Sequence, residues 1–219
     1  MDDRVRQARL LYERAVFSGD PGPLAEADRE LDAVEADLAL ARGRLVHTRF
    51  LLRRDENGAA AAEDPAELPL FERAAARYRS LGDAGGEAAA LFWIGCLHQI
   101  VRGDNPAAIP FFERSLELAA QAGDKATMSE TLRHLGIEAH AAGRLDQARQ
   151  RLEESTRLRR EIGSLPGAAA NMIGLAYIAA AQQRHDDARA LLDEATAIAE
   201  ATGAERIKQQ ADEARAALP

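Results

Sequence analysis

Apolar and small residues recur at helical spacing along most of the chain. In the segment from 145 to 162 they follow one another at steps of four, three, three and four residues, and charged residues fill the positions between them. This spacing gives an amphipathic helix with one stripe to bury. The stripe consists of Ala148, Leu152, Ser155, Leu158 and Ile162.

Glycines mark a regular repeat of this pattern. They stand at positions 82, 123, 163 and 203, at intervals of 41, 40 and 40 residues, and each follows a helix-like stretch. Glycine directly after a helix, followed by a capping Asp or Ser, ends one helix and starts the next. The residues that follow these glycines are Asp83, Asp124, Ser164 and Ala204.

A five-residue box upstream of each glycine repeats with the same period. The boxes span 70–74, 111–115, 151–155 and 191–195, and the second position of each is Phe or Leu. Two markers with one period indicate a true repeat. Each unit of about 40 residues is predicted to be a pair of antiparallel helices, and such pairs bury their stripes only by stacking on one another.

The unit resembles the tetratricopeptide repeat. That family has a small residue where the first helix contacts the second, an Ala early in the second helix, and a large and then a small residue four and seven positions later. In the unit that contains Trp93, either Gly95, with one extra turn residue, or Cys96 takes the small-residue place. The matching residues are Leu132, Leu135, Gly136, Ala148, Leu152 and Ser155 in the central unit, and Met172, Leu175, Ala176, Ala188, Leu192 and Ala195 in the next.

The resemblance implies an all-α fold, a right-handed superhelical solenoid of antiparallel helix pairs. The period of about 40 is similar to the variety that forms sensor arrays in bacterial multidomain transcription regulators. We expect one solenoid over 1–219, in which apolar positions from Leu31 to Leu45 predict one long helix over 23–54. Its expected parts are N-terminal helices forming an incomplete repeat (1–54), a flexible loop (55–64), regular repeats (65–203) and a C-terminal capping helix (204–219).

The composition of the chain limits the cellular compartments and the classes of binding partner that we expect. Hydrophobic residues make up 47% of the chain with only 5% aromatic residues, which favours small-residue packing of helix on helix. The net charge of −8 opposes direct binding of nucleic acid. A lone cysteine, Cys96, excludes an internal disulfide, and no apolar run is long enough for a signal peptide or a membrane span. The abundance of Ala and Arg suggests a bacterial origin, and we expect a cytoplasmic protein.

Catalytic and cofactor motifs do not occur in the sequence. It has no glycine-rich phosphate loop, no paired metal cysteines and no nucleophile elbow, and its five histidines form no His-x-x-x-His pair. We therefore expect no enzyme activity, no cofactor and no metal. The segment from Arg149 to Arg160 concentrates positive charge, but its interleaved glutamates favour pairing within the helix over the capture of an acidic partner.

Candidate binding residues follow from the resemblance alone. In tetratricopeptide arrays the first helix of each pair lines a concave groove, with residues one and four positions after the small residue, or three before it, pointing inward. The alternative is that the aromatic residues pack between helices, which we favour for Trp93. The implied residues are Arg133, Ile137 and His140 in the central unit and Ile173, Tyr177 and Ala180 in the next. In the earlier unit they are Phe92 or Trp93, Cys96 or Leu97, and Gln99 or Ile100.

Three functions are compatible with this groove. The first is a non-catalytic module that binds a peptide or protein segment. The second is a regulatory sensor array, related to bacterial transcription regulators, that binds a small ligand or self-associates. The third is an accessory or catalytic protein of a biosynthetic pathway. We also expect a homodimer formed through the N-terminal helices.

Overall fold

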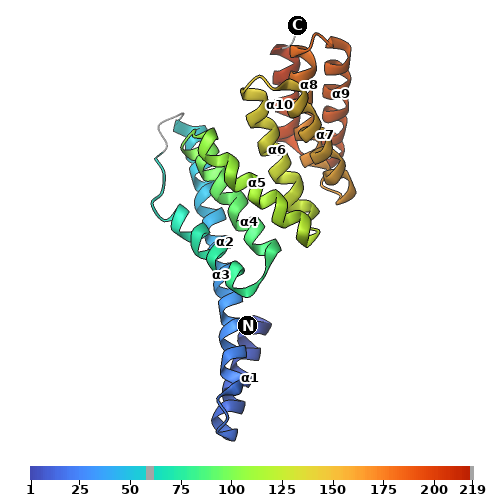
Figure 1. Ribbon diagram of the computed structural model, residues 1–219. Helices are drawn as coiled ribbons and strands as arrows, with labels where there is room; N and C mark the ends of the chain where they lie inside the picture. Colours follow the sequence, from blue (N-terminus) through green and yellow to red (C-terminus); the bar gives the residue numbers. More distant parts are fainter. Residues whose placement is uncertain (58–61, 218–219) are drawn as a thin grey trace. The chain divides into compact units, whose positions relative to one another are not determined.

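The computed structural model describes residues 1–57 and 62–217 (Figure 1). These residues form ten α-helices and one π-helical segment, so the predicted all-helical class is confirmed. The predicted loop over 55–64 lies partly outside the described residues, and the long helix over 23–54 extends to Asn57. In chain order the elements are α1 (Asp3–Ser18), α2 (Gly22–Asn57), α3 (Glu67–Leu81), α4 (Ala84–Cys96), η2 (Leu97–Val101), α5 (Asn105–Ala122), α6 (Lys125–Ala141), α7 (Leu145–Glu161), α8 (Leu165–Ala181), α9 (His185–Thr202) and α10 (Glu205–Ala217).

The chain divides into two compact units, Met1–Ala122 and Gly123–Pro219. In the first unit α1 to α5 pack in chain order, each against the next, and in the second unit α6 to α9 do the same. The last helix, α10, packs against both α8 and α9 and buries Ala211 and Ala214 there. Sequential antiparallel pairing of this kind is the arrangement that the repeat predicts.

The repeating glycines end helices as their sequence context predicts. Gly82 follows α3 in the left-handed conformation with a φ of 73°, where a Cβ atom would be strained. The next residue, Asp83, accepts a hydrogen bond from the backbone N–H of Gly86 at 2.9 Å and so caps α4. Asp124 caps α6 in the same way through the N–H of Thr127 at 3.1 Å.

Two pairs of helices, α4–α5 and α6–α7, are held close by a glycine in the first helix and a large side chain in the second. A Cβ atom on Gly95 would lie 2.6 Å from the ring of Phe112, closer than such atoms approach. Gly136 has the same relation to Leu152, at 3.0 Å. Gly95 therefore takes the small-residue place in the unit that contains Trp93. The extra residue of that unit is absorbed by the π-helical turn of η2, in which each turn holds one residue more.

Candidate functional site

In the second unit, α6 and α8, the first helices of their pairs, enclose a hollow together with α10. Its volume is about 250 Å³. Two predicted groove residues come from α6 and two from α8, each pair four residues apart and therefore on one side of its helix. The lining residues are Arg133, Ile137, Leu152, Ala170, Ile173, Gly174, Tyr177, Gln210 and Glu213.

The wall of this hollow is largely apolar. Ile173 is buried, while Ile137 and Tyr177 are 40% and 38% exposed and form its open edge. Gly174 lets Leu152 pack directly against the backbone of α8, since a Cβ atom there would stand 3.1 Å from Cδ1 of Leu152. Because Ile137 comes from α6 and Ile173 and Tyr177 come from α8, an apolar side chain of a ligand could pack against both helices at once.

Arg133 is fixed in place by a buried polar network. Its Nη1 donates to the carbonyl oxygen of Ala170 at 3.1 Å and to Oδ1 of Asn171 at 2.9 Å. The amide of Asn171 in turn donates to Oγ of Ser155 at 2.7 Å, and that hydroxyl donates to the carbonyl oxygen of Ser129 at 2.6 Å. The network ties α6, α7 and α8 together and sets the direction of the guanidinium.

No carboxylate in the described part of the chain pairs with Arg133. Among residues 1–57 and 62–217 it forms no ion pair, whereas the nearby Arg159 pairs with Glu130 at 2.7 Å. Burial lowers the pKa of Arg133, the positive charge of Arg159 lowers it further, and Glu130 partly opposes both. An anionic group in the hollow would relieve this unfavourable environment. Glu213, on the wall from α10, would disfavour a second anion.

The other predicted groove residues lie elsewhere. His140 is half-buried near the end of α6 and is absent from the lining of the hollow. In the first unit, Phe92 is buried with its ring 6.0 Å from that of Phe112, and Gln99 is half-buried in η2. Trp93 is half-buried between α2 and α3, where its ring stacks on Phe71 at 5.9 Å.

The first unit contains a buried pair of polar side chains that the sequence pattern did not predict. Nδ1 of His47 lies 2.7 Å from Oε1 of Glu67, and both side chains are almost fully enclosed. The edge of the His47 ring meets Trp93 at 5.2 Å, and Oε2 of Glu67 has no hydrogen-bond partner among the described residues. Because α2 and α3 each contribute one member, this pair joins the two helices.

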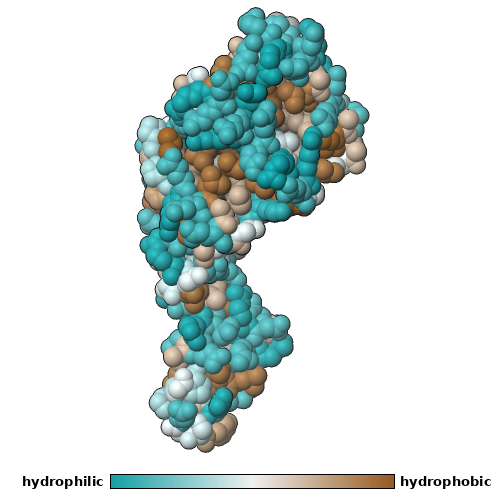
Figure 2. Space-filling model, turned by 45° about the vertical axis from the view of Figure 1, so that its right-hand side comes forward, coloured by the Kyte–Doolittle hydropathy of each residue, from teal (hydrophilic) through white to brown (hydrophobic). Residues whose placement is uncertain are grey.

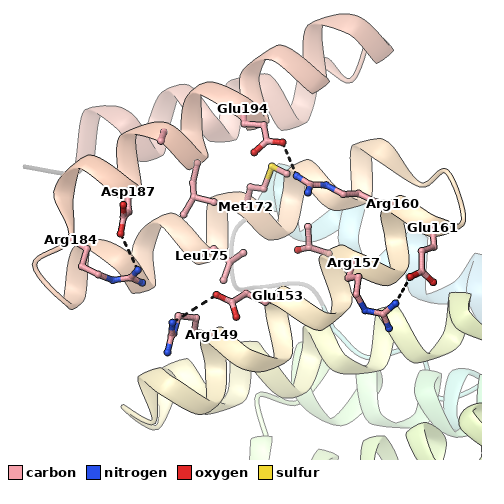
Figure 3. Close-up of a pocket in the computed structure, with 13 residues that line it drawn as sticks. Arg149, Glu153, Arg157, Arg160, Glu161, Met172, Leu175, Arg184, Asp187 and Glu194 are labelled. Carbon is pink, nitrogen blue, oxygen red and sulfur yellow. Dashed lines mark hydrogen bonds and ion pairs between the residues drawn. The ribbon is translucent and has the colours of Figure 1, made fainter.

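A larger hollow of about 700 Å³ lies on α7, α8 and α9 (Figure 3). Met172, Leu175 and Leu191 form its apolar floor. The rim carries equal numbers of basic and acidic side chains. They are Arg149, Arg157, Arg160, Arg184, Glu153, Glu161, Asp187 and Glu194.

Ion pairs within the chain neutralise this rim. Arg160 pairs with Glu194 at 2.6 Å, Arg184 pairs with Asp187 at 3.0 Å, and Arg157 pairs with Glu161 in the same helix (Figure 3). The predicted pairing within α7 therefore holds for Arg157, whereas Arg160 reaches across to α9. A rim without net charge offers less selective attraction than the unpaired guanidinium of Arg133.

The described residues contain no group of three His, Cys, Asp or Glu side chains that could hold a metal ion. None of the described helices is both long enough and apolar enough to cross a membrane.

Comparisons with known proteins agree with the architecture. Residues 97–161, from η2 to the end of α7, match the tetratricopeptide repeat family, which confirms the resemblance. A solved structure, the crystal structure of BtubC (BKLC) from P. vanneervenii, is similar with a TM-score of 0.51. It is 16% identical, and the match covers 92% of this chain and 90% of that chain, so the likeness concerns the fold. No curated protein matches this chain in sequence.

Proposed function

We propose that this chain, a tetratricopeptide repeat protein, is a non-catalytic interaction module that binds a peptide segment of a partner protein in the hollow of α6, α8 and α10. Repeats of this family generally serve as protein interaction modules. The observation that carries the proposal is the guanidinium of Arg133, which is held in position without an ion-pair partner among the described residues and lies beside an apolar wall. The Ala- and Arg-rich composition of the chain and its lone cysteine support the bacterial cytoplasm as the place where the protein works.

The chemistry of the hollow defines the peptide. One apolar side chain would pack between Ile137, Ile173 and Tyr177, and a carboxylate would accept hydrogen bonds from Arg133. That carboxylate could be the end of a chain or an acidic side chain. The volume of about 250 Å³ is below the roughly 300–1,000 Å³ of typical small-molecule sites and suits one or two side chains.

We expect peptides selected from a display library to bind through this hollow. Arg133→Met should weaken their binding by a factor of at least about ten, because it removes charge-assisted hydrogen bonds of roughly 1.5–3 kcal/mol. Tyr177→Ala should weaken it as well, and the selected sequences should share an apolar residue next to a carboxylate. Fluorescence anisotropy with labelled peptides measures both effects.

A variant on the larger hollow of α7, α8 and α9 serves as the control. Arg160→Met removes a guanidinium whose side chain is 50% exposed and paired with Glu194, and it should leave peptide binding unchanged. Loss of binding in Arg160→Met with retention in Arg133→Met would place the peptide site on α7 and α9 and refute the proposal.

The larger hollow supports the alternative of a small-molecule sensor or a pathway accessory protein. Its volume of about 700 Å³ falls within the range of small-molecule sites. A metabolite that binds the folded chain would add about 2.7 kcal/mol of stability at 100 times its dissociation constant. Our proposal predicts no such shift in a thermal-unfolding screen of metabolites. A shift that Leu191→Glu abolishes would favour the sensor.

A further inference from the structure

The long helix α2 carries a leucine at every seventh position. These leucines are 42–58% exposed, although leucine is among the residues most often buried. A heptad spacing keeps the side chains on one face of a helix over its length, here about 42 Å from the first to the last. The five residues are Leu24, Leu31, Leu38, Leu45 and Leu52.

This leucine face points away from the core of its own unit. Between 36 and 50, α2 buries a different stripe, which faces α3 and, through His47, contacts Trp93 of α4. A residue two positions along from a buried one lies about 200° around the helix, so Leu38 and Leu45 stand opposite Ala36 and Gly43. In Figure 2 the projecting part at the bottom, which α1 and the first half of α2 form, shows brown hydrophobic surface among the teal.

Charges beside the leucines change sign halfway along the helix. Four positions after successive leucines stand Asp28, Glu35, Arg42 and Arg49, acidic in the first half and basic in the second. In an antiparallel pair of α2 helices centred on Leu38, Asp28 would face Arg49 of the second copy and Glu35 would face Arg42 of the second copy. Charges that flank the apolar seam set the orientation of paired helices.

A parallel arrangement would bring like charges together. On the other flank of the leucines lie Glu30, Asp37 and Arg44. In a parallel pair each would approach the residue five positions later in the second copy, which places Glu30 near Glu35 and Arg44 near Arg49. Asp37 would approach Arg42, but it already pairs with Arg4 of its own chain at 2.7 Å. Two like-charge contacts against this one opposite-charge contact disfavour a parallel pair.

Most of these charges are available for such contacts. Within the described residues Asp28, Arg42 and Arg49 form no ion pair. Glu35 pairs with Arg77 at 3.1 Å, but its side chain remains 58% exposed. Asp28, Arg42 and Arg49, unpaired among the described residues, and the exposed Glu35 make this surface complementary to a second copy of itself.

We propose that two copies of this chain form an antiparallel dimer along the leucine face of α2, with Leu38 at the two-fold axis. The same patch serves both partners, as in most symmetric dimers. This interface uses none of the residues that line the hollow of α6, α8 and α10, so the dimer and the peptide site are tested independently.

Light scattering on the full chain tests the association. The dimer has twice the chain mass of 23.7 kDa. The double variant Leu31→Glu, Leu45→Glu should be a monomer with unchanged circular dichroism, since both side chains are already exposed. Leu10→Glu changes an equally exposed leucine on α1, 54% exposed, and should remain a dimer. A wild-type mass of 23.7 kDa at all concentrations, or a dimer that survives the double variant, would overturn the proposal.

Cysteine cross-linking tests the orientation. The native Cys96 is buried and does not compete. Under oxidation, Leu24→Cys should form a disulfide with Leu52→Cys of another chain when the two variants are mixed, and neither should cross-link to itself. Leu38→Cys should cross-link to itself. Self-cross-linking of Leu24→Cys would show a parallel pair and contradict the model.

Charge reversal gives a readout without oxidation. Arg49→Asp places two acids opposite each other in the antiparallel pair and should raise the dimer dissociation constant at least about tenfold. Adding Asp28→Arg restores opposite charges and should recover the affinity. Failure of the second change to recover it would exclude this register.

Discussion

Phe112→Ala is expected to lower the free energy of unfolding of the first unit by about 3–5 kcal/mol, the range for a phenylalanine truncated in a packed core. Phe112 has no exposed surface. Its ring fills the space that Gly95 leaves open, with a hypothetical Cβ atom on that glycine only 2.6 Å away.

The neighbouring Phe111 is the matched control for this change. It is half-buried and stacks on His98 with a ring separation of 5.3 Å. Phe111→Ala should therefore cost only about 1 kcal/mol. Denaturant unfolding followed by the fluorescence of Trp93, the only tryptophan, measures both variants. Equal losses would show that the contact between Gly95 and Phe112 does not hold this pair of helices together.

His47→Leu is expected to cost about 3 kcal/mol, because it leaves the carboxyl group of Glu67 buried without a partner. Oε1 of Glu67 lies 2.7 Å from Nδ1 of His47, and Oε2 already lacks a hydrogen bond among the described residues. The carboxyl group cannot reach water, since its side chain is fully buried at the start of α3.

A double-mutant cycle separates this interaction from packing. Adding Glu67→Leu to His47→Leu should recover most of the loss, since replacing both partners by apolar groups removes the unpaired polar atom. His98→Leu changes a half-buried histidine outside this pair and controls for the substitution itself. A double variant no more stable than His47→Leu alone would contradict the proposed role of the pair. Trp93, whose ring lies 5.2 Å from that of His47, again reports unfolding.

The regular helix pairs could be predicted from sequence because local chemistry specifies them. Gly82, Gly123 and Gly163 recur with one period and each ends a helix in the left-handed conformation. The spacing of Leu152 after Ala148 places both in the seam between α6 and α7. Signals of this kind lie within one or two helical turns, so they can be read without a structure.

The residue that takes the small-residue place in the repeat near Trp93 could be identified only from the structure. Gly95 and Cys96 are both small enough for the contact position, and only the distance to Phe112 distinguishes them. The π-helical turn over Leu97–Val101 accommodates the extra residue, and no local sequence signal predicts it.

Contacts between elements far apart in the chain also could not be predicted from the sequence. The sequence predicts a capping helix over 204–219, but it does not predict that Gln210 and Glu213 of this helix line the hollow around Arg133. The apolar positions from Leu31 to Leu45 predict a long helix, and α2 is such a helix. Its core face is a different one, however, and Leu31, Leu38 and Leu45 remain exposed.

Photo-cross-linking of a selected peptide tests the central claim most directly. A benzophenone amino acid placed at position 177, on the open edge of the hollow between α6 and α8, should capture the peptide. The same probe at position 191, on the floor of the hollow between α7 and α9, should capture little. Capture at 177 that Arg133→Met abolishes is the predicted result. Capture at 191 with none at 177 would show that this protein binds its partner through the other hollow.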